Sequence, residues 1–232
     1  MSHDLEAIAQ RALELISDDS VVGLGTGHAA TAFIHALGRK VADGFQIRGI
    51  PTSQASAELA QTLGIALSSL DEVEAIDVDV DGADEVDPQG SLIKGYGGAL
   101  VREKIVAAAS RRLVILVGEE KLVPQLGSHS RLPVEVVPFA LEACARRLAG
   151  LGFPSEARRR DDHLFVTDNG NYILDCRIQP LPRPEETERA IRDIPGVVGT
   201  GLFLGMGPTV LIGKGGKVEL REYGGDGQRN RR

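Results

Sequence analysis

The chain has 232 residues, of which 42% are hydrophobic and 25% are charged, and its formal net charge is −7. This composition is typical of a soluble globular protein, and the negative balance argues against nucleic-acid binding, which usually needs a basic face. No apolar run reaches the roughly 18 residues that span a bilayer, and the segment MSHDLEAIAQ lacks the apolar region of a signal peptide. We therefore expect a cytoplasmic protein with no nucleic-acid or membrane partner.

The cysteines and the arginine runs carry no functional motif. Cys144 and Cys176 match no disulfide or metal-site spacing, so we expect both to be buried and reduced. The run Arg158-Arg159-Arg160 is interpreted as part of an edge strand or as a solvated feature, and the arginines after residue 228 as a frayed tail.

Strand-like and helical patterns alternate through the first half of the chain. Strands are expected at 21–26, 45–50, 65–67, 75–80 and 113–117, and helices at 5–16, 29–37, 54–63 and 99–109. Such an alternation predicts a Rossmann-like parallel sheet with right-handed crossovers, and hence the α/β class.

The pattern changes after residue 127. Strands are expected at 134–137, 156–160, 163–167, 172–178 and 197–204, with helices at 139–151 and 185–193. This order fits a ferredoxin-like β-α-β-β-α-β unit. Two later runs, 209–213 and 218–220, are expected to return to the first sheet. We therefore predict a catalytic domain of residues 1–127 plus 206–232, and an inserted smaller α+β domain of residues 128–205 that serves as a lid or in oligomerisation.

A glycine-rich turn follows the first expected strand. Gly23, Gly25 and Gly27 do not complete the G-x-G-x-x-G pattern, but the turn Thr26–Ala29 opens a helix, whose N–H groups can hold a phosphate. A dinucleotide fold would place an acidic ribose ligand after the second strand, whereas this chain has Pro51-Thr52-Ser53 there. A hydroxyl-lined loop of this kind favours a sugar or a phosphate over NAD.

Most of the chemically useful side chains lie between Asp81 and Ala107, where a strand ends and a helix begins. Open α/β sheets bind their ligands at such places. Glu103 lies a few residues inside the helix. An isolated glutamate there would more often be a surface residue, but the surrounding glycines and the segment Asp81–Asp84 favour a general base.

Asp81 and Asp84 suit either hydrogen bonds to sugar hydroxyls or metal ligation. No histidine lies nearby and Lys94 competes for the carboxylates, so the sugar interpretation is preferred and no metal is expected. Lys94 would neutralise the aspartates or stabilise an oxyanion. Lys121 follows the strand expected at 113–117, and a solvated lysine and a ligand-binding one remain equally open.

Six segments together closely resemble type A ribose-5-phosphate isomerase. They are GLGTG at 23–27, DGADEVD at 81–87, KGYGGALVREKIVA at 94–107, LPVEVVP at 132–138, VTDNGNYILD at 166–175 and IPGVVGTGLF at 194–203. The resemblance extends from about residue 5 to residue 220, and the second and third segments are specific in combination.

The resemblance implies interconversion of ribose 5-phosphate and ribulose 5-phosphate in the non-oxidative pentose phosphate pathway, without a metal or organic cofactor, by a homodimer or a homotetramer. It implies that Glu103 moves a proton between C2 and C1 through a cis-enediolate and that Asp81 helps to open the furanose ring. Asp84 and Lys94 would bind and polarise the sugar oxygens. The full set of substrate-binding residues that it implies is Thr26, Gly27, His28, Ala29, Asp81, Gly82, Ala83, Asp84, Lys94, Gly95, Tyr96, Gly97 and Lys121.

The chain departs from the family pattern at three places. The phosphate turn usually reads GTGST but here has His28 and Ala29 at its end, so two hydroxyls are missing and His28 is a candidate replacement. Tyr96 stands in a glycine position, and the lysine often found in the first helix has no counterpart. Two alternatives stay open: an isomerase of another aldose phosphate, and a non-catalytic sugar-phosphate sensor. A sensor would have no need of Glu103, and we expect it to carry a DNA-binding module for which this sequence has no segment.

Overall fold

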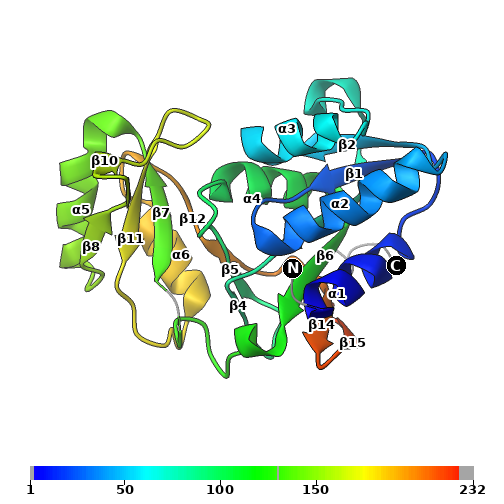
Figure 1. Ribbon diagram of the computed structural model, residues 1–232. Helices are drawn as coiled ribbons and strands as arrows, with labels where there is room; N and C mark the ends of the chain where they lie inside the picture. The colour runs from blue at the N-terminus through cyan, green and yellow to red at the C-terminus, as the bar shows by residue number, and fades with distance from the viewer. Residues whose placement is uncertain (1–2, 130, 225–232) are drawn as a thin grey trace. The chain divides into compact units, whose positions relative to one another are not determined.

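The computed structural model describes residues 3–129 and 131–224, which form two compact units (Figure 1). The first unit comprises the chain up to Ala83, Arg102–Lys121 and the chain from Gly205 onward. The second unit comprises Asp84–Val101 and Leu122–Leu204. Each unit has a sheet of its own.

The sheet of the first unit has, in the described ranges, the strand order β15-β14-β6-β3-β1-β2. Its strands are β1 (Ser20–Leu24), β2 (Ile47–Pro51), β3 (Ile76–Gly82), β6 (Ser110–Gly118), β14 (Thr209–Lys214) and β15 (Lys217–Glu222). All neighbours pair in parallel except β14 and β15, which pair antiparallel. The predicted parallel sheet and the return of the last two strands to it are confirmed. The carboxyl ends of β1, β3 and β6 therefore share one edge.

Helices cover both faces of this sheet (Figure 1). They are α1 (His3–Leu13), α2 (His28–Ala42), α3 (Gln54–Thr62) and α4 (Leu100–Ala109), with short 3-10 turns η1 (Leu70–Glu72) and η2 (Glu119–Lys121). Val22 and Leu24 of β1 pack in the core formed with α1 and α2, whereas Val21, which points the other way, packs with Val106 of α4. Alternate residues of β1 are thus buried on opposite faces, as a parallel sheet requires.

Two expected elements of the first unit differ in the structure. The first helix ends at Leu13 instead of Ile16. The run 65–67 does not form a strand of the sheet. It makes only an isolated parallel bridge between Leu67 and Gly49 of β2. Its pairing with β2 is limited to Gly49, whose N–H donates to the carbonyl of Ala66 and whose carbonyl accepts from the N–H of Ser68.

The second unit has the predicted ferredoxin-like arrangement. Its antiparallel sheet has the order β12-β7-β11-β8 in the described chain, where the strands are β7 (Leu132–Val136), β8 (Ser155–Ala157), β11 (Tyr172–Cys176) and β12 (Val197–Thr200). Helices α5 (Leu141–Gly150) and α6 (Pro184–Arg192) complete the β-α-β-β-α-β order. The other elements are η3 (Pro138–Ala140) and a hairpin of β9 (Arg159–Arg160) and β10 (His163–Leu164).

A small three-stranded sheet makes the second unit larger than the sequence predicts. Its order is β13-β5-β4, with β4 (Glu85–Val86), β5 (Leu92–Ile93) and β13 (Leu202–Phe203). Since β5 pairs with β13, the segment Asp84–Val101 belongs to the second unit. From the local sequence pattern alone, that segment and residues 122–127 are expected in the first domain, whereas the structure groups them with the second unit.

Both cysteines, Cys144 and Cys176, are buried and free, as predicted. Within the described ranges, no helix combines the length and apolar character needed to cross a membrane.

Candidate active site

The turn between β1 and α2 leaves the amino end of a long helix open. Gly27 is the N-cap residue at φ 104°, a conformation that favours glycine, and no side-chain cap is found among the described residues. His28 is exposed, Ala29 is half-buried, and the first turn carries no acidic residue. The first N–H groups of a helix have no partner inside it and lie at the positive end of its dipole. The expected residues Thr26–Ala29 therefore form a turn that can bind an anion.

Buried hydroxyl groups fix the position of this turn through hydrogen bonds. The Thr52 hydroxyl donates to the carbonyl of Leu24 (3.0 Å), and the Ser56 hydroxyl donates to the carbonyl of Gly25 (2.6 Å). Thr26 Oγ1 lies 2.7 Å from Thr52 Oγ1, and because the Thr52 proton is already used, Thr26 is the donor. Ser53 is the N-cap of α3 and accepts from the backbone N–H of Ser56.

These contacts change one interpretation of the sequence. Thr52 and Ser53 were expected to line a ligand loop, but both are buried and bonded to the protein. Their role is to support the turn. Ser56 was missed, although its place three residues after a serine N-cap is a recognisable signal.

Asp81 lies at the end of β3, fully buried, beside the end of β1. Its Oδ1 accepts hydrogen bonds from the backbone N–H groups of Thr26 (3.1 Å) and Gly82 (2.7 Å). Gly25 is the reason this approach is possible, since a Cβ there would lie 2.2 Å from Asp81 Oδ1. Two backbone donors to one oxygen fix the orientation of the carboxylate.

Glu103 lies one turn inside α4 and is only 2% exposed. Val106 and Ala107, further along the same helix, are also buried. The alternative of a solvated surface glutamate is therefore wrong. A buried carboxylate on a rigid helix has the fixed geometry that a general base requires.

Lys121 ends η2, directly after β6, and is half-buried. It thus follows a strand whose carboxyl end shares an edge with the ends of β1 and β3. This location keeps the ligand-binding alternative open.

In the second unit, Asp84 directly precedes β4 and Lys94 directly follows β5, so both residues lie at the same end of this antiparallel pair. The backbone N–H of Asp84 donates to the carbonyl of Ile93 (2.8 Å), and that of Lys94 donates to the carbonyl of Gly201 (2.9 Å). Lys94 is buried, and its Nζ lies 5.4 Å from the centre of the Phe203 ring. Backbone hydrogen bonds thus hold both residues at the ends of short strands.

The loop after Lys94 returns to Asp84. The backbone N–H of Tyr96 donates to Asp84 Oδ2 (3.2 Å), and the Tyr96 hydroxyl accepts from the backbone N–H of Arg131 (2.8 Å). Gly95 and Gly98 have positive φ, whereas Tyr96 does not, so a side chain at position 96 causes no backbone strain. The ring is 49% exposed.

The structure thus groups the expected residues within each unit. In the first unit, hydrogen bonds join Thr26, Asp81 and Gly82, and a Cβ on Gly82 would lie 3.4 Å from Ala29 Cβ. In the second unit, Asp84, Lys94, Gly95 and Tyr96 share one strand pair and its loop. Ala83 is half-buried and Gly97 is exposed.

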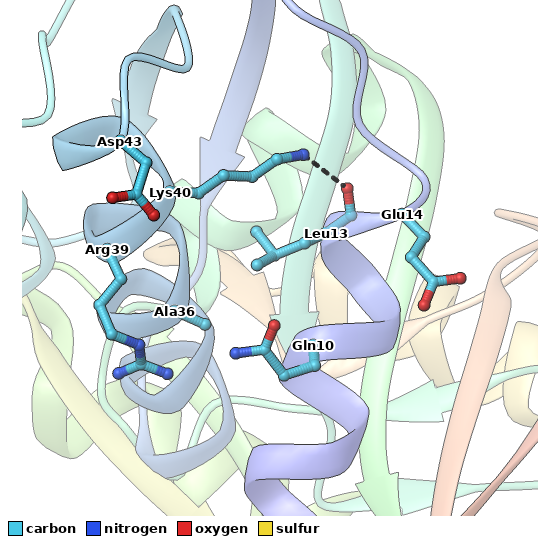
Figure 2. A pocket seen from close by; sticks show the side chains of 7 residues that line it. All are labelled: Gln10, Leu13, Glu14, Ala36, Arg39, Lys40 and Asp43. Carbon is cyan, nitrogen blue, oxygen red and sulfur yellow. Dashed lines mark hydrogen bonds between the residues drawn. The ribbon is translucent and has the colours of Figure 1, made fainter.

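A groove lies between the carboxyl ends of α1 and α2 in the first unit (Figure 2). It has a volume of about 510 Å³ and is lined by Gln10, Leu13, Glu14, Ala36, Arg39, Lys40 and Asp43. The Lys40 ammonium reaches across it towards the carbonyl of Leu13 (3.5 Å) and covers the Phe45 ring. Because α1 precedes β1 and α2 precedes β2, the groove is at the amino edge of the sheet, opposite the edge that bears Asp81.

Known proteins resemble the chain over most of its length. An isomerase from Gloeobacter violaceus named ribose-5-phosphate isomerase A is 50% identical over 216 residues, which are 93% of this chain and 94% of the relative. The solved structure of ribose 5-phosphate isomerase A from Methanocaldococcus jannaschii is 39% identical and has a TM-score of 0.89, covering 94% of this chain and 98% of its own.

A second solved structure is a D-ribose-5-phosphate isomerase in complex with phospho-erythronic acid. It is also 39% identical, with a TM-score of 0.91, and the match covers 94% of this chain and 97% of that one. The profile of the family ribose 5-phosphate isomerase A (phosphoriboisomerase A) matches residues 48–217. With its fold, its buried Glu103 and this match over more than half of its length, the chain belongs to the ribose 5-phosphate isomerase A family.

Proposed function

We propose that this chain interconverts D-ribose 5-phosphate and D-ribulose 5-phosphate in the non-oxidative pentose phosphate pathway. The burial of Glu103 on α4, in a chain of this family, is the observation that carries the proposal. Relatives with about half of their residues identical bear the name of this activity, and one structural relative binds phospho-erythronic acid. That ligand is a phosphorylated sugar acid whose planar carboxylate resembles an enediolate.

Glu103 acts as the base in this mechanism. It removes the proton from C2 of the open-chain aldose, which leaves a cis-enediolate with oxygens on C1 and C2. The hydroxyl proton then passes from O2 to O1, and Glu103 returns its proton to C1, which gives the ketose with its carbonyl at C2. The charge that develops on the two oxygens needs a nearby cation, and Lys94 is the buried candidate. Glu103 supplies the base and Lys94 supplies the cation that stabilises the enediolate oxygens, so the proposal requires neither a metal nor an organic cofactor.

The remaining residues bind and prepare the substrate. Asp81, held by two backbone donors, assists the opening of the furanose ring. Asp84 hydrogen-bonds the sugar hydroxyls, the turn Thr26–Ala29 receives the phosphate, and Lys121 contacts the substrate. Gly82, Ala83, Gly95, Tyr96 and Gly97 line the space around it. Asp81 and Asp84 are three residues apart, so their Cα atoms are at most about 11 Å from each other and both can reach one pentose.

A panel assay tests the substrate. Purified protein is offered four-, five- and six-carbon aldose phosphates, with and without EDTA, and the ketose product is measured. We expect ribose 5-phosphate to give the highest kcat/KM and EDTA to have no effect. Preference for another aldose phosphate would favour the alternative suggested by His28, Ala29 and Tyr96, and a metal-reversible loss in EDTA would overturn the cofactor-free mechanism. Binding without turnover of any sugar would favour a sensor.

We also propose that the protein is a homodimer or a homotetramer of the cytoplasm. Phe139 in η3 is 102% exposed, and contact with a second copy of the chain would remove its apolar surface from water. The two free thiols fit a reducing compartment. Light scattering after size exclusion should give at least a dimer, and Phe139→Glu should shift the mass downward; a monomeric wild type would contradict the assembly proposal.

A further inference from the structure

Arg158 makes an unusually complete set of hydrogen bonds in the second unit. It follows β8, and its guanidinium binds the carboxylate of Asp175 on β11 through two bonds, Nε to Oδ2 at 2.9 Å and Nη2 to Oδ1 at 2.5 Å. The two side chains are only 14% and 16% exposed. A paired, shielded fork of this kind is geometrically rigid.

The third nitrogen of the same guanidinium binds the loop that follows Lys94. Nη1 donates to the carbonyls of Gly95 (2.8 Å) and Tyr96 (3.2 Å). The backbone of Arg158 is itself fixed, since its N–H donates to Ile173 and its carbonyl accepts from Phe165. Arg158 therefore ties the loop to the central sheet of the unit.

One peptide group links Arg158 to Asp84. The carbonyl of Gly95 and the N–H of Tyr96 belong to the same planar peptide, whose two ends point in opposite directions. The carbonyl accepts from Arg158, and the N–H donates to Asp84 Oδ2. A charged donor on the carbonyl polarises the peptide and makes its N–H a better donor to the carboxylate.

The loop that follows Lys94 is rich in glycine, so contacts from outside the loop help to fix its conformation. Gly95 and Gly98 both have positive φ, and Gly97 lies between Tyr96 and Gly98. Glycine permits many backbone conformations, so the orientation of the Gly95–Tyr96 peptide is not set by local sterics. Within the loop, the N–H of Gly98 donates to the Gly95 carbonyl over 3.1 Å, and Phe165 packs against Gly98, where a Cβ would lie 2.4 Å from the ring. Arg158 adds a charged donor from outside the loop to that same carbonyl.

We propose that Arg158 is a positioning residue for catalysis, which orients Asp84 and the backbone next to Lys94 through the Gly95–Tyr96 peptide. The inference rests on the proposed roles of Asp84 and Lys94. Arg158→Lys keeps the charge but cannot bind Asp175 through two bonds and also reach both carbonyls. We expect kcat to fall by roughly 10- to 100-fold, as for a small misplacement of catalytic groups, with a smaller change in KM.

Arg177→Lys is the matched control. Arg177 directly follows β11, the strand that carries Asp175, and it pairs with Glu156 of β8, the strand that precedes Arg158. The side chains of Arg177 and Glu156 are 66% and 61% exposed, whereas those of Arg158 and Asp175 are shielded. Its replacement should leave kcat and the melting temperature nearly unchanged. Asp175→Asn is a second variant, which weakens the hydrogen bonds to the Arg158 guanidinium and leaves Arg158 itself unchanged. If Arg158→Lys does not fold, the kcat of Asp175→Asn tests the inference in its place.

A double-mutant cycle then separates positioning from general stability. If Arg158 acts through Asp84, Arg158→Lys should cost much less kcat in an Asp84→Asn background than in the wild type, whereas its cost should be unchanged in a His28→Ala background. Full kcat in folded Arg158→Lys, or equal costs in all three backgrounds, would overturn the inference. Failure of the wild type to isomerise ribose 5-phosphate would instead overturn the proposed function.

Discussion

The backbone N–H of Thr26 donates to Oδ1 of Asp81 over 3.1 Å. This bond joins the turn proposed to bind phosphate to the carboxylate proposed to open the sugar ring. It exists because β1 and β3 are parallel neighbours whose carboxyl ends meet at one edge. The position of one group therefore sets the position of the other.

Gly25→Ala should break this relationship. The new Cβ would lie 2.2 Å from Asp81 Oδ1 and 2.6 Å from Asp81 Cβ, so the strand end or the carboxylate must move. We expect the free energy of unfolding to fall by about 1–3 kcal/mol, as is typical of overpacking. We expect kcat/KM to lose a larger fraction of its wild-type value than the free energy of unfolding does. Chemical denaturation and steady-state kinetics measure the two effects.

Gly150→Ala is the control for that substitution. Gly150 ends α5, its φ is not positive, and an added methyl group would meet open space, with no atom of the described surroundings within 4 Å. The change should therefore leave activity intact. An active, stable Gly25→Ala protein would show that the close approach to Asp81 is not needed.

His28→Ala tests whether the exposed histidine at the start of α2 replaces the missing hydroxyls. A contact to a remote phosphate contributes similar binding to the substrate and the transition state, so KM should rise more than kcat falls. The same KM for both proteins from pH 6 to 8 would exclude His28 from the site.

Strong local signals allowed much of the fold to be predicted. The apolar run 113–117 is the core of β6, and the helix expected at 54–63 is α3. The unit to which Asp84–Val101 belongs could not be predicted, because it depends on pairing between β5 and β13, which lie far apart along the chain. Local pattern carries no information about such a pairing.

The candidate site also contains some residues that the local sequence indicates and others that only the fold reveals. Glu103 and Asp81 could be proposed from the sequence because acidic residues and glycines cluster between a strand and a helix. Arg158 could not, because in the run Arg158-Arg159-Arg160 only the fold distinguishes the first arginine, which is largely shielded and bonded, from the exposed pair that follows. For Arg158 the interpretation as a solvated residue is wrong, whereas the edge-strand interpretation fits, because Arg158 directly follows β8 at the edge of its sheet and its N–H donates to Ile173 of β11.

Cys176 should be chemically silent in the native protein. Burial, and then the charge of Asp175, raise the pKa of its thiol from 9.0 to about 12. Because the unfolded chain ionises first, this thiol favours folding below pH 9, and that contribution is lost between pH 9 and about 12. Iodoacetamide at pH 8 should label Cys176 only after denaturation, as read by mass spectrometry; rapid labelling of the native protein would contradict its burial.

Isotope exchange gives a further expectation for Glu103. A carboxylate that carries a proton between carbons can exchange it with water before returning it. Ribose 5-phosphate deuterated at C2 should therefore lose part of its label to solvent during turnover, which mass spectrometry of the ribulose 5-phosphate measures. Complete transfer of deuterium to C1 would argue for a hydride shift instead.

The turnover of Glu103→Gln tests the account most directly. Glutamine keeps the shape of the buried side chain but cannot accept the proton from C2. We expect kcat to fall by roughly 10²–10⁴-fold, which corresponds to about 3–5 kcal/mol in the barrier, while phospho-erythronic acid still binds to the folded variant. Near-normal kcat in a correctly folded Glu103→Gln protein would contradict the assignment of Glu103 as the base.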